Sequence, residues 1–226
     1  MKKGIFISGT DTGIGKTLVS ALLVSSLKHF LRPAGYFKPV QTGVDPLTPS
    51  DLSTVRSLVE FSEEEWAPSV YEFPEPMAPA RAAELNQASI QLDLIEHAWS
   101  QLPPRHWVVE GAGGLLVPLN PKQTIRDLIA ELNLRLLLVC STRLGTINHT
   151  LLSLEAAHAA RIPVAGVVLM GSPDLGLKKW IQQFTSVPIL AEIPLLPQVS
   201  PHTVKTQGPQ FFPASVLEQL FENRVN

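Results

Sequence analysis

Residues 4–17 read GIFISGTDTGIGKT, and this stretch decides the fold. Residues 4–8 form a short, mostly apolar run that predicts a β-strand. From residue 16 onward the apolar residues recur at helical spacing, so a glycine-rich turn joins this strand to a helix. The turn ends in Gly15-Lys16-Thr17, and a loop of this kind at a helix N-terminus cradles phosphate oxygens with its backbone N–H groups.

The last residues of this turn have specific expected roles. Lys16 would reach the β- and γ-phosphates of a nucleotide, and the Thr17 hydroxyl would bind Mg²⁺. Five residues separate Gly9 from Gly15 where the common motif has four, so a strict pattern would miss the loop. A glycine-rich turn that only caps a helix is the alternative. The preceding strand and the Gly-Lys-Thr ending favour nucleotide binding.

The rest of the chain alternates short apolar runs with helical patterns. The predicted strands cover residues 36–40, 107–109, 134–140, 163–170 and 187–193. The predicted helices cover residues 16–31, 51–60, 89–101, 124–132, 146–160 and 175–184, and the proline-rich segment 62–80 is predicted to be a loop. Apolar strands that alternate with helices are typical of a parallel sheet covered on both faces. We therefore predict an α/β, P-loop NTPase-like fold with a mostly parallel sheet, formed by a single domain over residues 1–226.

The composition excludes several classes of function. Charged residues make up 17% of the chain, the net charge is -2 and no basic stretch stands out, so we expect no nucleic-acid partner. The single cysteine, Cys140, lies in an apolar run and is expected to be a small buried residue. The first apolar run is interrupted at once by residues 9–16, and no run reaches the length of a membrane span. We expect a soluble cytoplasmic protein that does not bind membranes.

Two carboxylates and a second lysine are candidates for the same site. Glu110 follows the apolar run at 107–109 and precedes a glycine-rich segment, as a metal-binding carboxylate does in P-loop enzymes. Asp51 begins a predicted helix, where a metal ligand and an ordinary N-terminal charge are equally compatible with the pattern. Lys38 ends a predicted strand, where its charge would stabilise a transferred phosphoryl group, although surface exposure is the commonest fate of a lysine.

These segments resemble the dethiobiotin synthetase family, in order along the chain. The resemblance rests on GTDTGIGKT at 9–17, AGYFKPV at 34–40 followed by Thr42-Gly43, Ser50-Asp51, VEGAGG at 109–114 followed by Pro118-Leu119, LGTINH at 144–149, and EIP at 192–194. The blocks span roughly residues 5–197, and the segment after Pro197 matches poorly. Each block is moderately specific, but the ordered set is highly specific.

The resemblance implies roles for the matched residues. Lys16 and Lys38 would be catalytic, and Thr17, Asp51 and Glu110 would hold Mg²⁺. The implied ATP site consists of Thr12, Gly13, Ile14, Gly15, Lys16, Thr17, Leu18, Asp51, Glu110, Gly111, Ala112, Gly113, Met170, Gly171, Pro194, Leu195 and Leu196. The implied substrate site consists of Thr42 together with Gly145, Thr146, Ile147 and Asn148, the last four acting across a homodimer interface.

The resemblance also implies a reaction. One amine of 7,8-diaminononanoate would form a carbamate with CO₂ (or bicarbonate), and the carbamate oxygen would attack the γ-phosphate of ATP. The second amine would then close the cyclic urea on the mixed carbamic–phosphoric anhydride and release phosphate. Dethiobiotin and ADP would result, in a step of biotin biosynthesis. Phosphoryl transfer of this kind needs mainly positioning and charge stabilisation, which two lysines and Mg²⁺ supply.

The sequence departs from the family at the end of the predicted strand 163–170. Many members carry an asparagine there that recognises adenine, whereas this chain has Met170 and Gly171. A thioether cannot donate a hydrogen bond as an amide does. We expect base recognition either to rest on backbone groups near residues 194–196 or to be relaxed.

Three other functions share parts of this pattern. A related switch ATPase would carry an extra lysine just after the first loop glycine, where this chain has Thr10. An amidoligase resembling the cobyrinate synthetases would add a glutaminase domain with a nucleophilic cysteine, and no such motif is present in these 226 residues. A catalytically inactive nucleotide-binding module would not need the lysines and Glu110.

Overall fold

The computed structural model describes residues 2–221 and contains a seven-stranded sheet whose paired strands are all parallel. The strand order is β4-β2-β6-β1-β7-β8-β9. These strands are β1 (Lys3–Gly9), β2 (Ala34–Phe37), β4 (Trp66–Ala67), β6 (His106–Gly114), β7 (Arg135–Ser141), β8 (Val164–Met170) and β9 (Ile189–Ile193). A separate two-stranded parallel sheet pairs β3 (Val40–Thr42) with β5 (Tyr71–Phe73). This architecture confirms the predicted fold class.

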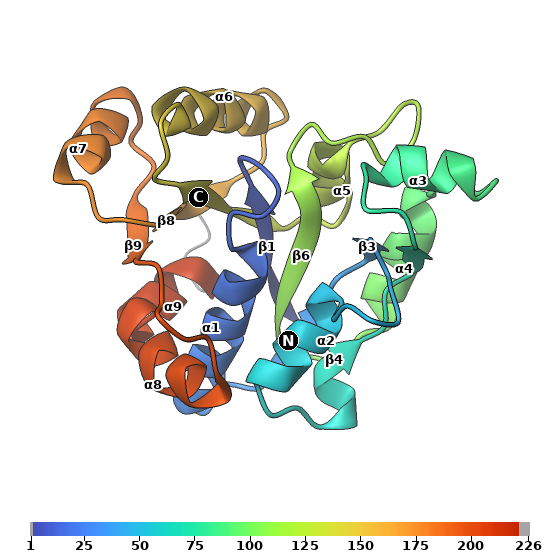
Figure 1. Cartoon of the computed structure of the whole chain (residues 1–226), viewed down its shortest axis with the longest axis horizontal. Coiled ribbons are helices and arrows are strands. Elements are labelled where there is room, and N and C mark those ends of the chain that lie inside the picture. Colours follow the sequence, from blue (N-terminus) through green and yellow to red (C-terminus); the bar gives the residue numbers. More distant parts are fainter. Residues whose placement is uncertain (1, 222–226) are drawn as a thin grey trace.

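Helices cover both faces of the large sheet (Figure 1). They are α1 (Lys16–His29), α2 (Asp51–Leu58), α3 (Pro79–Leu85), α4 (Leu92–Gln101), α5 (Ile125–Glu131), α6 (Thr146–Ala159), α7 (Leu175–Phe184), α8 (Pro201–Phe211) and α9 (Ala214–Phe221), together with the 3₁₀ helix η1 (Glu63–Glu65). Among residues 2–221, every helix is too short or too polar to cross a lipid bilayer.

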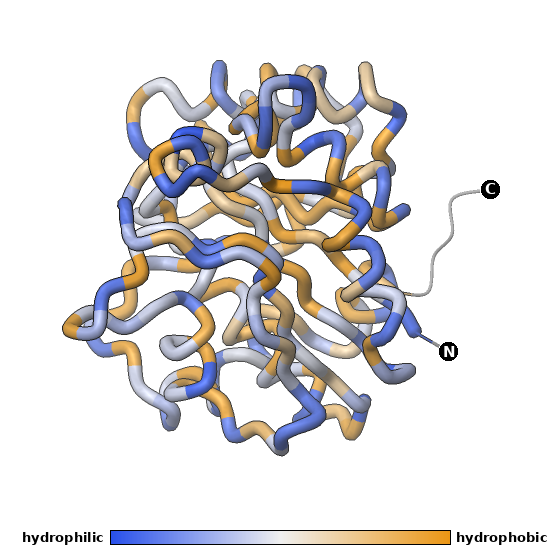
Figure 2. Tube along the Cα trace, turned by 90° about the vertical axis from the view of Figure 1, so that its right-hand side faces the viewer, coloured by the Kyte–Doolittle hydropathy of each residue, from blue (hydrophilic) through white to orange (hydrophobic). Residues whose placement is uncertain are grey.

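The side chains of β1 show how the sheet divides the core. Phe6 packs on the side of α4, α5 and α6, whereas Ile5 and Ile7 pack on the side of α1, α8 and α9, and all three are fully buried. Successive residues of a strand point to opposite faces, so a strand covered on both faces must be apolar at every position. Figure 2 shows many hydrophobic stretches of the trace, in orange, passing through the interior of the molecule.

The structure corrects three of the predictions. The predicted strand 36–40 is two strands in different sheets, because Pro39 has no N–H to donate and Lys38-Pro39 interrupts the ladder. The predicted loop 62–80 contains η1, β4, β5 and the start of α3. The strand predicted to end at Glu110 continues as β6 to Gly114, and its pairing with β1 shifts register beyond Glu110.

The segment after Pro197, which the sequence left unassigned, closes the core beside α1. Gly208 of α8 lies against that helix, and a Cβ placed there would be 2.7 Å from the backbone oxygen of Leu22. The hydroxyl of Ser26 on α1 donates to the backbone oxygen of Phe212, which is itself fully buried. These contacts hold α8 against the helix that begins at the glycine-rich loop.

We expect Gly208→Ala to destabilise the fold. Alanine gains about 1 kcal/mol over glycine in helix propensity, but overpacking against rigid backbone costs about 1–3 kcal/mol, so the clash outweighs the gain. Urea unfolding should show a lower midpoint at an unchanged slope. Gly176→Ala is the matched control, because Gly176 is an exposed helical glycine whose added Cβ meets only Asp174 Oδ1, at 3.2 Å. A Gly208 variant as stable as the Gly176 variant would contradict the close packing of α8.

Candidate active site

The glycine-rich loop lies between the end of β1 and the start of α1. Gly13 and Gly15 have positive φ angles, of 67° and 99°, which side chains other than glycine rarely adopt. Gly15 is also crowded, because an added Cβ would lie 2.8 Å from the Cε of Met170. The Lys16 ammonium donates to the backbone oxygen of Asp11 at 2.8 Å. The lysine side chain therefore folds back over the loop, close to where the backbone N–H groups would hold phosphate.

Four polar side chains from four separate segments meet beside this loop. The Thr17 hydroxyl on α1 donates to Asp51 Oδ1 at 2.7 Å and lies 3.0 Å from Glu110 Oε1. The Lys38 ammonium lies 2.9 Å from Asp51 Oδ2 and 3.1 Å from Glu110 Oε1. Ser50 positions Asp51 by capping α2, since its side chain accepts a hydrogen bond from the Ser53 N–H. The structure thus brings together the three predicted metal ligands and the second predicted lysine.

Glu110 is held on both carboxylate oxygens although it is almost completely buried. Its Oε2 accepts hydrogen bonds from the Ser20 hydroxyl at 2.7 Å and the Tyr36 hydroxyl at 2.9 Å. Its Oε1 faces Thr17 and Lys38. A buried charge needs partners of this kind, because removing a carboxylate from water is otherwise strongly unfavourable.

Burial and neighbouring charges act in opposite directions on the two lysines. Burial lowers the pKa of Lys16 below its ordinary value, and the attraction of Glu110 only partly offsets this. Burial also acts to lower the pKa of Lys38, but the contacts with Glu110 and Asp51 outweigh it and raise that pKa. For Asp51, burial acts to raise the pKa, and the Lys38 charge with the hydrogen bonds from Lys38 and Thr17 lowers it. Lys38 and Asp51 therefore form a charged pair at neutral pH.

The residues present fit a magnesium ion bound together with a nucleotide. Mg²⁺ in phosphate-transfer sites takes one or two carboxylates and completes its shell with phosphate oxygens and water. Thr17, Asp51 and Glu110 offer one hydroxyl and two carboxylates within hydrogen-bonding distance of one another. Within residues 2–221, no group of three or more His, Cys, Asp or Glu side chains is arranged to hold a metal ion.

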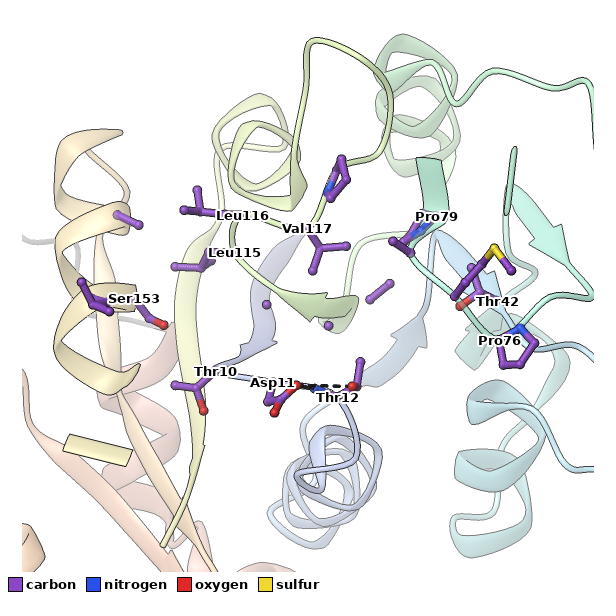
Figure 3. Close-up of a pocket in the computed structure, with 18 residues that line it drawn as sticks. Thr10, Asp11, Thr12, Thr42, Pro76, Pro79, Leu115, Leu116, Val117 and Ser153 are labelled. Atoms are coloured by element: carbon purple, nitrogen blue, oxygen red, sulfur yellow. Dashed lines mark hydrogen bonds between the residues drawn. The ribbon is translucent and has the colours of Figure 1, made fainter. Parts of the chain in front are cut away.

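Two adjoining cavities open beside the loop. The smaller, of about 480 Å³, contains the polar cluster and is lined by residues including Gly13, Gly15, Lys16, Thr17, Leu18, Lys38, Asp51 and Glu110. The larger, of about 760 Å³, is walled by Thr10, Asp11, the prolines of the segment 76–79, residues 114–118 and one side of α6 (Figure 3). Thr12, Thr42, Ala112 and Gly113 line both cavities. A molecule in the larger cavity would therefore lie next to a phosphate bound in the smaller one.

Comparisons with known proteins identify the family. A family model described as an AAA domain matches residues 3–203. An ATP-dependent dethiobiotin synthetase from Agrobacterium fabrum is 41% identical over 209 residues, which cover 91% of this chain and 92% of that protein. The chain belongs to the dethiobiotin synthetase family. A bifunctional protein of biotin biosynthesis from Bordetella avium is 42% identical, and the match covers 89% of this chain but only 42% of that longer protein.

Solved structures show how widely this fold is shared. A ParA family ATPase from Chlorobium tepidum superimposes with a TM-score of 0.55, covering 97% of this chain and 95% of that one. The two chains are only 12% identical, so the likeness concerns the fold alone. A shared fold does not establish a shared activity, which depends on the residues of the site.

Several residues implied by the family resemblance line neither cavity. The Ile14 side chain is buried in the core, and the backbone oxygen of Gly111 accepts a hydrogen bond from the Lys38 ammonium. Met170 is buried against Gly15, and the N–H of Gly171 donates to the Ile193 backbone oxygen. Beyond β9, Pro194 and Leu196 are partly exposed and Leu195 is exposed, outside both cavities.

The predicted substrate residues at the start of α6 also lie outside both cavities of the single chain. Gly145 and Asn148 are exposed, Ile147 is partly buried, and Thr146 points inward with a hydroxyl that has no hydrogen-bond partner. Of the predicted substrate residues, only Thr42 lines the cavities.

Sequence reasoning missed several residues that the structure places at the site. Ser20 lies one helical turn beyond Lys16, and Tyr36 lies two residues before Lys38, so simple periodicity would have placed both near the cluster. Gln41 and Val199 also line the smaller cavity. Val199 precedes α8 and had no sequence signal, because only the tertiary fold brings that segment back to the loop.

Cys140 takes no part in the site and should be unreactive in the native protein. Burial raises the pKa of its thiol to about 12, against about 8.5 for an unfolded cysteine. Because the pKa is higher in the folded protein, the buried neutral thiol contributes its full share to the free energy of unfolding below about pH 8.5. This contribution is lost as the pH rises toward 12.

At about pH 8, where an accessible unfolded cysteine reacts readily, a thiol reagent should modify the native protein far more slowly than the unfolded chain. Labelling followed by absorbance in buffer and in concentrated guanidinium chloride tests this expectation. Rapid labelling of the folded protein would show that the thiol is accessible.

Proposed function

We propose that the protein catalyses the ATP-dependent closure of 7,8-diaminononanoate and CO₂ to dethiobiotin, a step of biotin biosynthesis. The main support is the position of the Lys16, Thr17, Lys38, Asp51 and Glu110 cluster, which adjoins a second cavity large enough for a small organic substrate. Membership of the dethiobiotin synthetase family, with relatives named ATP-dependent, supports the same reaction.

The chemistry needs no nucleophile from the protein. One amine of the substrate adds to CO₂ and loses a proton, which gives a carbamate. A carbamate oxygen attacks the γ-phosphorus of ATP, and the bond to the bridging oxygen breaks to release ADP. The second amine then attacks the carbonyl carbon of the mixed anhydride and loses a proton to water, and phosphate leaves as the cyclic urea closes. The protein must align the carbamate with the γ-phosphate and stabilise the charge that moves between them.

The lysines and the loop perform these tasks. The loop N–H groups and Lys16 hold the phosphates, and Lys38 stabilises the carbamate and the charge that develops during transfer. Mg²⁺ held by Thr17, Asp51 and Glu110 would neutralise phosphate charge and polarise the γ-phosphoryl group. Because Lys38 already contacts Asp51 and Glu110, its ammonium is held beside the smaller cavity, called the phosphate cavity below because it would hold the phosphates of ATP.

The larger cavity would hold the diamine. Its wall combines the hydroxyls of Thr10, Thr12 and Thr42 with an apolar side that includes Leu115, Leu116 and Val117, as Figure 3 shows. The polar side faces the phosphate cavity, so the amines would lie there and the aliphatic chain would follow the apolar side. Exclusion of water from such a pocket protects the reactive anhydride from hydrolysis.

A homodimer would complete the substrate site. Leu144 is fully exposed, and Leu116 and Leu152 are each more than half exposed. Leu116 and Leu152 line the larger cavity, and Leu144 directly precedes the α6 N-terminus where residues 145–148 lie. Pairing of two copies through this surface would bury the leucines and bring residues 145–148, at the N-terminus of α6, to the carboxylate of the substrate in the other copy.

The first test is phosphate release by the purified protein with MgATP and bicarbonate. Phosphate release should depend on 7,8-diaminononanoate, and mass spectrometry should detect dethiobiotin. Replacing ATP with GTP or CTP would then show whether the enzyme, which has Met170 and Gly171 in place of the asparagine, accepts bases other than adenine. Phosphate release that ignores the diamine would instead indicate a switch ATPase, and the absence of any turnover would indicate a binding module.

Lys38→Met should abolish most turnover without abolishing nucleotide binding. Loss of one preorganised electrostatic group typically lowers turnover by about 10²–10³-fold. The matched control is Lys28→Met, because Lys28 also forms an ion pair, 2.7 Å from Glu65, but lies outside the site. Steady-state kinetics and ADP titration of both variants separate the two effects. Equal activity of the two variants would remove Lys38 from the mechanism.

Leu152→Asp should convert the dimer to monomers and raise the KM for the diamine. A charge placed in an apolar interface is desolvated without a partner. Sedimentation velocity measures the first effect and kinetics the second. Leu94→Asp, which changes an exposed leucine on α4, should leave both quantities unchanged. A wild-type protein that is monomeric at assay concentrations would rule out the shared substrate site.

A further inference from the structure

Two hydroxyl groups outside the predicted site hold one oxygen of Glu110. Ser20 Oγ lies 2.7 Å and Tyr36 Oη 2.9 Å from Oε2, and both donor side chains are fully buried. The other oxygen, Oε1, is left facing Thr17, at 3.0 Å, and Lys38, at 3.1 Å. The two ends of the carboxylate therefore have different surroundings: one is held by the core, and the other faces the phosphate cavity.

Strand register and helix periodicity produce this arrangement. Tyr36 of β2 pairs with Val108 of β6, and Glu110 lies two residues further along β6. All three side chains are therefore expected on the same face of the sheet, toward α1. On α1, Ser20 follows Thr17 by three residues, so both hydroxyls project from the same side of the helix toward the carboxylate. The phenol and the hydroxyl thus meet Oε2 from two different elements.

We propose that Tyr36 and Ser20 are positioning residues that fix Glu110 so that Oε1 faces the nucleotide-bound Mg²⁺. This inference rests on the proposed function, since it concerns the metal of that reaction. A carboxylate can rotate about its last side-chain bond, and two donors on one oxygen remove that freedom. Partners that orient a metal ligand typically alter metal affinity by about 10–100-fold when removed.

Tyr36 is suited to act only as a donor. Its side chain is fully buried, and its hydroxyl lies 2.9 Å from Glu110 Oε2, an ionised carboxylate oxygen that can only accept a hydrogen bond. The phenol therefore acts as the donor in this hydrogen bond. Tyr36→Phe removes one hydrogen-bond donor and leaves the ring that packs in the core, so it changes the support of Glu110 more than the shape of the core.

The test compares nucleotide affinity with and without metal. Calorimetric titration with β,γ-imido ATP, in Mg²⁺ and in EDTA, gives the factor by which Mg²⁺ tightens binding. In Tyr36→Phe and in Ser20→Ala this factor should fall by about 10–100-fold, while affinity in EDTA changes by less than about twofold. The control is Tyr71→Phe, which alters the other tyrosine of the chain, where the hydroxyl accepts from the Gln91 N–H.

Two results would overturn the inference. The Mg²⁺ factor of both variants could match that of Tyr71→Phe, or affinity in EDTA could fall as much as affinity in Mg²⁺, which would indicate a general structural role. If Tyr36→Phe fails to fold, Ser20→Ala alone decides, because it removes a single hydroxyl from the interior of α1. A wild-type protein whose affinity is the same in Mg²⁺ and EDTA would instead contradict the metal site of the proposed function, and is measured first.

Discussion

The site depends on keeping one buried carboxylate charged. Glu110 lies on β6, inside the sheet, and only 1% of its surface is exposed. An unpaired charge at such a buried position would be unfavourable by several kcal/mol. Its partners come from α1, β2 and the residue that follows β2, so the charge is stable only when these elements are correctly packed. The same contacts that make the charge tolerable also place Lys38 and Thr17. Stability and chemistry therefore rest on one network.

This network explains why two lysines can share a small volume. Lys16 bends toward a loop carbonyl, and Lys38 is ion-paired with Asp51 and Glu110, so each ammonium has its own partners. Burial lowers the pKa of Lys16, whereas the contacts of Lys38 with Glu110 and Asp51 outweigh burial and raise its pKa. A nucleotide entering the smaller cavity would meet positive charge that is already oriented, and preorganised charge is the main source of rate enhancement in phosphoryl transfer.

The fold determines where the site lies, but the residues of the site determine the reaction. A ParA family ATPase shares the topology at 12% identity. In this chain a larger cavity lies beside the glycine-rich loop, and Thr12, Thr42, Ala112 and Gly113 form a wall common to both cavities. A shared wall lets an organic substrate approach a phosphate directly, as a synthetase requires, whereas hydrolysis needs only water at that position. The alternatives to the proposed function differ in the occupant of this second cavity.

The sequence by itself determined the α/β class, the loop at residues 9–17 and the acidic and basic residues near it. It could do so because strand and helix periodicities, and the Gly-Lys-Thr ending, are local patterns. Segments 36–40 and 62–80 were misassigned because short strands next to prolines have weak local signals, and their pairing partners are distant in sequence. Only the tertiary structure decided that Ser20 and Tyr36 hold Glu110 and that Val199 returns to the phosphate cavity. Those contacts join residues tens to more than a hundred positions apart, and no local pattern encodes a distance across the fold.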